Sequence, residues 1–140
     1  MAEKMFTASA VAEGGRNGHV KSENGLIDHK LVMPQGKESS SDGTNPEQLF
    51  AAGYAACFDG ALNLIASKAN KEIDSKIEAE VSLLKDPEDD GFKIGVTLNV
   101  SINGVSQADA EELAEKAHEF CPYSKATRGN IDVDLKVKAE

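Results

Sequence analysis

The chain has 140 residues, with 24 acidic against 15 basic side chains, a formal net charge of −9 and two cysteines. This length suits one domain, so residues 1–140 are expected to fold as a single domain that needs no disulfide scaffold, which two cysteines could not form in any case. The negative charge occurs without a basic cluster, which disfavours nucleic acid and anionic membranes as partners.

The sequence predicts neither a signal peptide nor a membrane span. Residues 1–11 lack the apolar core of a signal peptide. The longest mostly apolar stretch, 49–66, contains Asp59 and Asn63 and is shorter than the roughly 20 apolar residues that a bilayer requires. We therefore expect a cytoplasmic protein whose thiols are normally reduced.

The N-terminal third predicts three strands joined by glycine-containing turns. Asn24-Gly25 is the strongest short hairpin signal in the chain. The expected elements are a strand at 6–12, a turn at 14–18, a strand at 19–23, a return strand at 26–33 and a polar loop at 34–43.

A long apolar helix follows. Two pairs of residues around Pro46 have the spacing of a capping box, Thr44 with Glu47 and Asn45 with Gln48. The helix should therefore begin within a residue of Asn45, and it could run to about Asn70. Seven of the eleven residues at 51–61 are Gly or Ala, and larger apolar side chains surround the helix. A helix that is apolar on all sides must be buried, and a monomer of this size covers it poorly. We therefore predict a homodimer.

The second half predicts a hairpin, a helix and a last strand. Apolar and polar residues alternate at 77–83 and 92–102 around an acidic turn at 86–91. A helix should begin at Ser106 and end near Pro122, and 131–137 alternate again. The order βββ-α-ββ-α-β is an α+β arrangement with antiparallel-rich sheets.

Cys57 is a candidate reactive thiol inside the first helix. It lies about eleven residues from the helix start, which is a rise of roughly 16 Å. The helix dipole stabilises a thiolate mainly within the first turn, so a reactive Cys57 would need a separate cation. The alternative is an inert buried cysteine.

Cys121 follows 64 positions later, next to Pro122 at the predicted end of the second helix. A thiol in a rigid helix and another at a helix end suit a reactive and a resolving cysteine. The spacing is neither CxxC nor a paired zinc motif. From the residues alone, a redox pair and two unrelated cysteines both stay open.

Two charged residues could serve such a thiol. Arg16 stands in a glycine-flanked turn, where it could lie over a site or be solvated, and Glu47 could simply cap the helix. Glu47 and Cys57 are ten residues apart, about 15 Å in rise and about 80° in azimuth on a regular helix. If Glu47 serves Cys57, it must come from a partner chain or from a broken first turn.

Other candidates have structural interpretations. One face of the first helix is interpreted as core packing, with an apolar pocket around the sulfur as the alternative: Phe50, Tyr54, Cys57, Ala61 and Leu64. The three histidines, His19, His29 and His118, lack the mutual spacing of a metal site, so no metal is expected. His118 is interpreted as structural, with tuning of Cys121 as the alternative.

Two long segments carry a resemblance to a known family. Residues 44–58 (TNPEQLFAAGYAACF) and 121–131 (CPYSKATRGNI), together with Gly14-Gly15-Arg16 and Asn24-Gly25, closely resemble the organic hydroperoxide resistance proteins, the Ohr subfamily of the OsmC/Ohr family. Lys125 is a departure, because members often have asparagine there.

The resemblance implies an intertwined homodimer whose central helices are wrapped by sheets. It implies that Cys57 is the peroxidatic cysteine and Cys121 the resolving one, with Arg16 stabilising the thiolate and Glu47 orienting Arg16. The implied reaction reduces alkyl and fatty-acid hydroperoxides to alcohols through a Cys57 sulfenic acid and a Cys57–Cys121 disulfide. No cofactor is bound; the implied external reductant is dihydrolipoamide or a lipoylated protein, regenerated by lipoamide dehydrogenase.

Two other functions are compatible with the sequence. One is a general thiol–disulfide exchange enzyme or a broader OsmC-type peroxidase with other substrates. The other is a non-enzymatic dimeric redox sensor or binding protein, which would need an effector surface that the sequence does not reveal.

Overall fold

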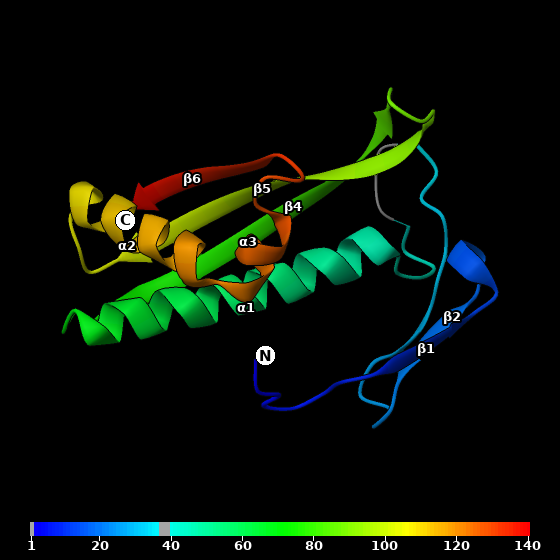
Figure 1. Cartoon of the computed structure of the whole chain (residues 1–140), viewed down its shortest axis with the longest axis horizontal. Helices are drawn as coiled ribbons and strands as arrows, with labels where there is room; N and C mark the ends of the chain where they lie inside the picture. Colours follow the sequence, from blue (N-terminus) through cyan, green and yellow to red (C-terminus); the bar gives the residue numbers. More distant parts are fainter. Residues whose placement is uncertain (1, 37–39) are drawn as a thin grey trace. The chain divides into compact units, whose positions relative to one another are not determined.

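The computed structural model describes residues 2–36 and 40–140, so residues 37–39 of the expected polar loop lie outside the description. The chain forms two compact units, Met1–Leu49 and Phe50–Glu140. The α+β prediction is confirmed (Figure 1). The expectation of a single domain stays a prediction.

The N-terminal unit contains a small antiparallel sheet in the order β1-β2-β3. Its elements are β1 (Ala10–Glu13), the 3-10 turn η1 (Gly15–Asn17), β2 (His19–Ser22) and β3 (Asp28–Lys30). The predicted strands at 6–12 and 26–33 were too long, because the ladder begins at the Ala10–Ser22 pair and β3 pairs with β2 over only three residues. Apolar alternation alone does not make a strand where no partner strand lies alongside.

Helix α1 (Pro46–Lys68) confirms the predicted long helix. Asn45 is its cap, since the Asn45 side-chain oxygen accepts a hydrogen bond from the Gln48 backbone N–H at 2.7 Å. At 23 residues, α1 is longer than the predicted apolar stretch, and by length and composition alone it could cross a membrane. A core helix of a soluble protein passes the same test, and Tyr54 and Phe58 of α1 are fully buried.

The second unit contains a three-stranded sheet in the order β4-β5-β6. The predicted hairpin is confirmed and is longer than expected: β4 (Asp74–Asp86) and β5 (Gly91–Asn103) are antiparallel along thirteen residue pairs. Strand β6 (Val133–Ala139) pairs with β5 in parallel. The alternation in β5 places four side chains in the core: Val96, Leu98, Val100 and Ile102.

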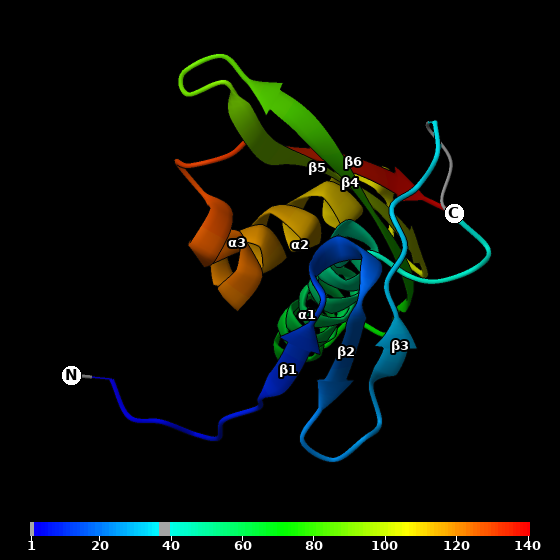
Figure 2. The same ribbon diagram turned by 90° about the vertical axis from the view of Figure 1, so that its right-hand side faces the viewer.

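Two further helices cover the same face of this sheet as α1 (Figures 1 and 2). Helix α2 (Gln107–Phe120) begins as predicted, because the Ser106 hydroxyl accepts from the Asp109 N–H. One face of α2 is buried: Ala110, Leu113, Ala114 and Ala117.

A third helix, α3 (Pro122–Thr127), was not predicted. Pro122 does end α2 as expected, with Cys121 at φ −59° and ψ 126°. However, proline is also favoured at the first position of a helix, and Pro122 starts α3 there. The observed order is therefore βββ-α-ββ-αα-β. Residues 128–130 form a turn toward β6.

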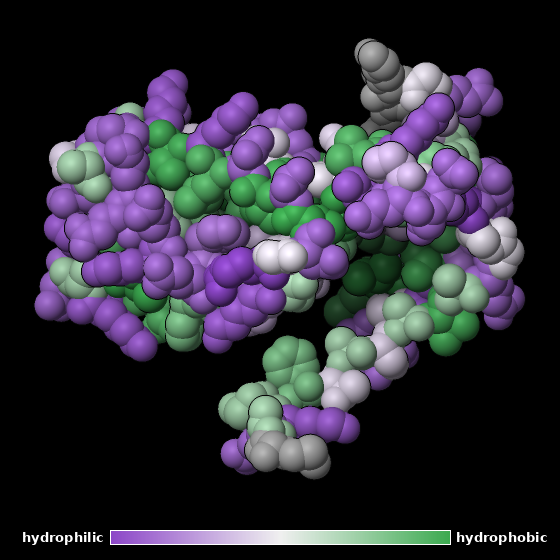
Figure 3. Space-filling view, turned by 45° about the horizontal axis from the view of Figure 1, so that its top comes forward, coloured by the Kyte–Doolittle hydropathy of each residue, from purple (hydrophilic) through white to green (hydrophobic). Residues whose placement is uncertain are grey.

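On the face drawn in Figure 3, polar side chains alternate with patches of apolar ones. In β1, β2 and β3 every residue is exposed or half-buried, so this small sheet has no buried core of its own. The most exposed large apolar residues are Met5, Phe6, Leu26, Val11 and Phe92.

Candidate active site

Cys57 and Cys121 lie together in the second unit. Their sulfur atoms are 3.6 Å apart, and both cysteines are free thiols. Cys121 is completely buried, whereas Cys57 is only partly buried. The sequence left open whether the two thiols meet. The structure brings them into contact, and the less buried of the two, Cys57, lies on α1.

The breaks around Pro122 explain how Cys121 reaches this position. Cys121 caps the end of α2, because its backbone N–H donates a hydrogen bond to the Ala117 carbonyl at 2.8 Å. It is also the residue immediately before α3. Its extended ψ turns the chain between the two helices. As a result its side chain is held at a junction of helices, opposite the middle of α1.

The surroundings of Cys57 oppose its ionisation within this unit. Burial is the largest influence and raises the pKa of the Cys57 thiol, and the neighbouring Cys121 raises it further. A backbone hydrogen bond from Tyr123, in the first turn of α3, acts in the opposite direction. The net pKa is raised, so the groups of this unit favour the thiol form of Cys57 over the thiolate.

A buried polar network lies beside the two sulfurs. The Tyr54 hydroxyl is 2.7 Å from the Ser124 hydroxyl, which is 2.7 Å from Nδ1 of His118. Thr127 adds a weaker contact to Tyr54 at 3.3 Å. Burial lowers the pKa of His118, with Arg128 as a further cause. The sequence did not reveal this network, because its members are up to 73 residues apart.

Aromatic rings pack next to this network. Phe50, Tyr54 and Tyr123 have ring centroids 5.7–6.0 Å apart. Gly53 makes this packing possible, since a Cβ there would lie 2.9 Å from the Tyr123 hydroxyl. Leu64, expected on the same face, is 41% exposed and therefore does not share this environment.

A surface cavity of about 460 Å³ adjoins the aromatic rings. Its lining is predominantly apolar: Phe50, Ile94, Tyr123, Ala126, Thr127, Asn130 and Ile131. Tyr123 therefore both lines this cavity and influences the pKa of the Cys57 thiol through its backbone.

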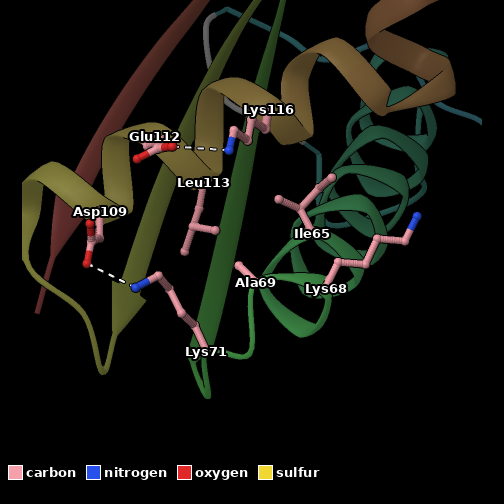
Figure 4. Close-up of a pocket in the computed structure, with 8 residues that line it drawn as sticks. All are labelled: Ile65, Lys68, Ala69, Lys71, Asp109, Glu112, Leu113 and Lys116. Carbon is pink, nitrogen blue, oxygen red and sulfur yellow. Dashed lines mark hydrogen bonds and ion pairs between the residues drawn. The ribbon is translucent and has the colours of Figure 1, made fainter.

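A second cavity, of about 290 Å³, lies between α1 and α2 (Figure 4). Its charged groups are already paired, Lys71 with Asp109 at 3.2 Å and Lys116 with Glu112 at 3.1 Å. Lys68 points away from both pairs. This cavity has no cysteine or histidine in its lining, so it offers no comparable chemistry.

Arg16 and Glu47 form a bidentate ion pair in the N-terminal unit. Nη1 lies 2.6 Å from Oε1 and Nη2 lies 2.9 Å from Oε2. The hydrogen bond from Arg16 lowers the pKa of Glu47, against a smaller opposing effect of burial. Bidentate geometry fixes the orientation of the guanidinium. Glu47 therefore binds Arg16, while Asn45 supplies the helix cap.

The four residues singled out from the sequence thus form two pairs, one in each unit. Helix α1 is continuous from Pro46 to Lys68, so the broken first turn considered for Glu47 is absent. Ten residues of regular helix separate Glu47 from the Cys57 of its own chain. The roles assigned to the four residues stay predictions.

The remaining sequence candidates have structural explanations. His19 pairs with Asp28 on the surface at 2.5 Å. The Lys125 ammonium lies 5.7 Å from the centroid of the Phe120 ring. Within the described residues, no group of three or more His, Cys, Asp or Glu side chains could hold a metal ion.

The fold and the paired free thiols define a small α+β protein with a dithiol at a helix junction. The family of OsmC-like proteins matches residues 36–136. The organic hydroperoxide resistance protein OhrB of Bacillus subtilis is 59% identical over 134 residues, which cover 96% of this chain and 98% of OhrB. OhrA of the same organism is 50% identical over 139 residues, covering 98% and 99% of the two chains.

Solved structures agree with these relatives. The crystal structure of Bacillus subtilis OhrB matches with a TM-score of 0.91 at 58% identity, covering 96% of this chain and 100% of that one. An organic hydroperoxide resistance protein from Legionella pneumophila matches with a TM-score of 0.90 at 49% identity, covering 97% and 99%. The chain belongs to the OsmC family, in its organic hydroperoxide resistance branch, as the two sequence segments indicated.

Proposed function

We propose that this protein is a thiol-dependent peroxidase that reduces organic hydroperoxides to alcohols. The relatives named for organic hydroperoxide resistance support the substrate class. The observation that carries the chemistry is the 3.6 Å contact between a partly exposed Cys57 and a buried Cys121. An accessible thiol can meet a peroxide, and a shielded neighbour can resolve the product.

The reaction has two oxidative steps. The Cys57 thiolate attacks the terminal oxygen of ROOH, the O–O bond breaks, and the alkoxide takes a proton and leaves as ROH. Cys57 becomes a sulfenic acid. The Cys121 thiol then condenses with it, water leaves, and a disulfide forms with an S–S length near ~2.05 Å. Starting from 3.6 Å, this closure needs only a small approach of the two sulfurs.

Arg16 supplies a positive charge that stabilises the Cys57 thiolate and so lowers the raised pKa of that thiol. Glu47 accepts two hydrogen bonds from the guanidinium and holds its plane. Because α1 is unbroken and the Arg16–Glu47 pair forms within one chain, both residues reach the site together, from the partner of a homodimer. In this arrangement each active site combines the dithiol of one chain with the ion pair of the other.

A homodimer also accounts for exposed apolar surface. The three-stranded sheet β1–β3 lacks a buried core, and α1 leaves Ala52, Ala56 and Leu64 exposed. A second copy would cover such surface at an energetic gain of roughly 25 cal/mol per Å² of apolar area. The intertwined dimer expected from the family resemblance is therefore part of the proposal.

Alkyl and fatty-acid hydroperoxides suit the site better than hydrogen peroxide. The cavity beside Tyr123 can bury the apolar chain of a substrate. Hydrogen peroxide has no apolar area to bury there. The disulfide is reduced by an external dithiol, dihydrolipoamide or a lipoylated protein, which lipoamide dehydrogenase regenerates; the reaction takes place in the cytoplasm.

The test is consumption of tert-butyl hydroperoxide by the purified protein with dihydrolipoamide as the only thiol. We expect turnover, and slower consumption of hydrogen peroxide at equal concentration. A stoichiometric oxidation without turnover would favour a redox sensor. Equal turnover with glutathione would favour a general thiol–disulfide exchange enzyme.

A further inference from the structure

The network of Tyr54, Ser124 and His118 joins three helices beside the dithiol. Tyr54 belongs to α1, Ser124 to α3 and His118 to α2, and consecutive members are 2.7 Å apart. Tyr54 and Ser124 are completely buried. No buried side-chain nitrogen or oxygen in the described part of the chain lacks a hydrogen-bond partner, so the network is fully satisfied.

Each member lies three residues from a cysteine. Tyr54 precedes Cys57 by three residues on α1, His118 precedes Cys121 by three residues, and Ser124 follows Cys121 by three. Residues three apart on a helix lie on the same side, as Tyr54 and Cys57 do, and Cys121 stands at the junction between the helices that carry His118 and Ser124. The hydrogen bonds therefore connect the segments that carry the two sulfurs at points immediately beside those sulfurs.

Apolar packing alone would position the helices less strictly. A van der Waals contact loses little when two helices slide by a few tenths of an ångström, whereas a buried hydroxyl that loses its partner costs about 1–3 kcal/mol. Satisfied buried networks for this reason specify one arrangement. Here the arrangement specified is the approach of α3 and the end of α2 to the middle of α1.

We propose that the Tyr54–Ser124–His118 hydrogen-bond chain is a positioning device that holds Cys121 against Cys57 and thereby sets the efficiency of disulfide closure. The inference rests on the proposed function, because closure of the disulfide matters only if Cys57 forms a sulfenic acid. Closure and oxidation by a second hydroperoxide molecule then compete for that sulfenic acid. In closure, the Cys121 sulfur bonds to the sulfenic sulfur of Cys57 and water leaves. If closure slows, ROOH oxidises the sulfenic acid to sulfinic acid and is itself reduced to ROH.

The first test uses no hydroperoxide. Reduced protein is equilibrated in buffers of reduced and oxidised glutathione, and the constant for formation of the Cys57–Cys121 disulfide is measured by mass spectrometry. Tyr54→Phe loses one hydroxyl and keeps the ring; the loss of its bond to Ser124 should lower the constant roughly fivefold. Ser124→Ala loses the hydroxyl that both neighbours share and should lower it further.

Ser75→Ala is the matched control. It removes a hydroxyl that links β4 to α1 through Asp59 and Asn63, without touching α3. Its disulfide constant should stay within twofold of the unmodified protein. If Ser124→Ala does not fold, the disulfide constant of Tyr54→Phe alone tests the proposal. The proposal would be overturned if the disulfide constants of the network variants stayed within twofold of the unmodified protein. It would also be overturned if Ser75→Ala lowered the constant as much as they do.

The second test separates positioning from general damage to the site. With tert-butyl hydroperoxide, Tyr54→Phe should form the Cys57 sulfenic acid at a rate within twofold of the unmodified protein, but the sulfinic fraction per turnover should rise roughly fivefold. A fall in the rate of sulfenic acid formation with no rise in sulfinic acid would contradict a positioning role. An inactive peroxidase would leave the glutathione result intact, so failure of the proposed function is distinguishable.

Discussion

The two units of the chain hold their functional residues by different means. In Phe50–Glu140, Cys57 and Cys121 are fixed by a continuous core between α1, α2 and one face of a sheet. In Met1–Leu49, Arg16 lies on a short turn and is fixed by two hydrogen bonds to Glu47. The thiols thus depend on packing and the cation depends on electrostatics, so the two pairs should respond to different perturbations.

The largest expected effect comes from the cysteines themselves. Cys57→Ser should abolish hydroperoxide consumption, because serine forms no sulfenic acid. Cys121→Ser should retain one stoichiometric turnover and leave a sulfenic acid that dimedone traps. Rates are followed by hydroperoxide consumption and the adduct by mass spectrometry. Equal activity of the two variants would show that the assignment of roles is wrong.

Packing within one chain should dominate stability in the second unit, whereas the N-terminal unit should gain packing only from a second copy. Phe58 is fully buried, and Phe58→Ala should lower the free energy of unfolding by about 3–5 kcal/mol. Leu26 in the N-terminal unit is 83% exposed, and Leu26→Ala should change it by less than about 0.5 kcal/mol in a monomer. Urea unfolding measures both. A large loss for Leu26→Ala would indicate that a second copy covers this surface.

Removing the cation should slow the thiol without unfolding the core. Arg16→Ala should reduce alkylation of Cys57 by iodoacetamide at pH 7 about tenfold, which corresponds to a rise of one unit in the thiol pKa. The pH–rate profile should shift upward by the same amount. Lys21→Ala, in the same unit, is the control and should leave the profile in place. If the pH–rate profile of Cys57 alkylation did not shift in Arg16→Ala, Arg16 would not stabilise the thiolate.

The partner-chain origin of the ion pair can be tested by complementation. Cys57→Ser and Arg16→Ala should each be inactive or slow as separate dimers. After unfolding and refolding together, half of the dimers carry both chains, and one of their two sites combines Arg16 of one chain with Cys57 of the other, so the mixture should recover about a quarter of full activity. If both residues come from the same chain, mixing restores nothing.

The smallest effect concerns acid stability. Arg16 lowers the pKa of Glu47 below its ordinary value of 4.5, so the ion pair stabilises the fold above that value and the contribution is lost as pH falls through the lowered pKa. Because Arg16 is 39% exposed, the effect should be below about 1 kcal/mol. Glu47→Gln should therefore narrow the difference in unfolding free energy between pH 6 and pH 3. An unchanged difference would mean that the ion pair does not form in solution.

Much of the fold followed from local sequence signals. The helix cap at Asn45, the alternation in β5 and the start of α2 at Ser106 act within a few residues, and each was predicted correctly. The start of β1 was wrong because strand length depends on the partner strand. Helix α3 was missed because Pro122 both ends one helix and begins the next.

The sequence predicted which residues belong to the candidate site, but it did not predict how they are arranged in space. The motif segments single out Cys57, Cys121, Arg16 and Glu47, but their pairing depends on contacts across 64 and 31 residues. The hydroxyl of Ser124 gave no sequence signal, because a serine near a helix end is ordinary. Its importance comes from Tyr54, 70 residues away, and from complete burial.

The most direct test of the account is to treat the fully reduced protein with one equivalent of tert-butyl hydroperoxide and map the product by non-reducing peptide mass spectrometry. The account predicts one equivalent of tert-butanol, the loss of two hydrogen atoms per chain, and a disulfide joining Cys57 to Cys121 within one chain. Both cysteines still reduced, or a disulfide only between chains, would contradict it.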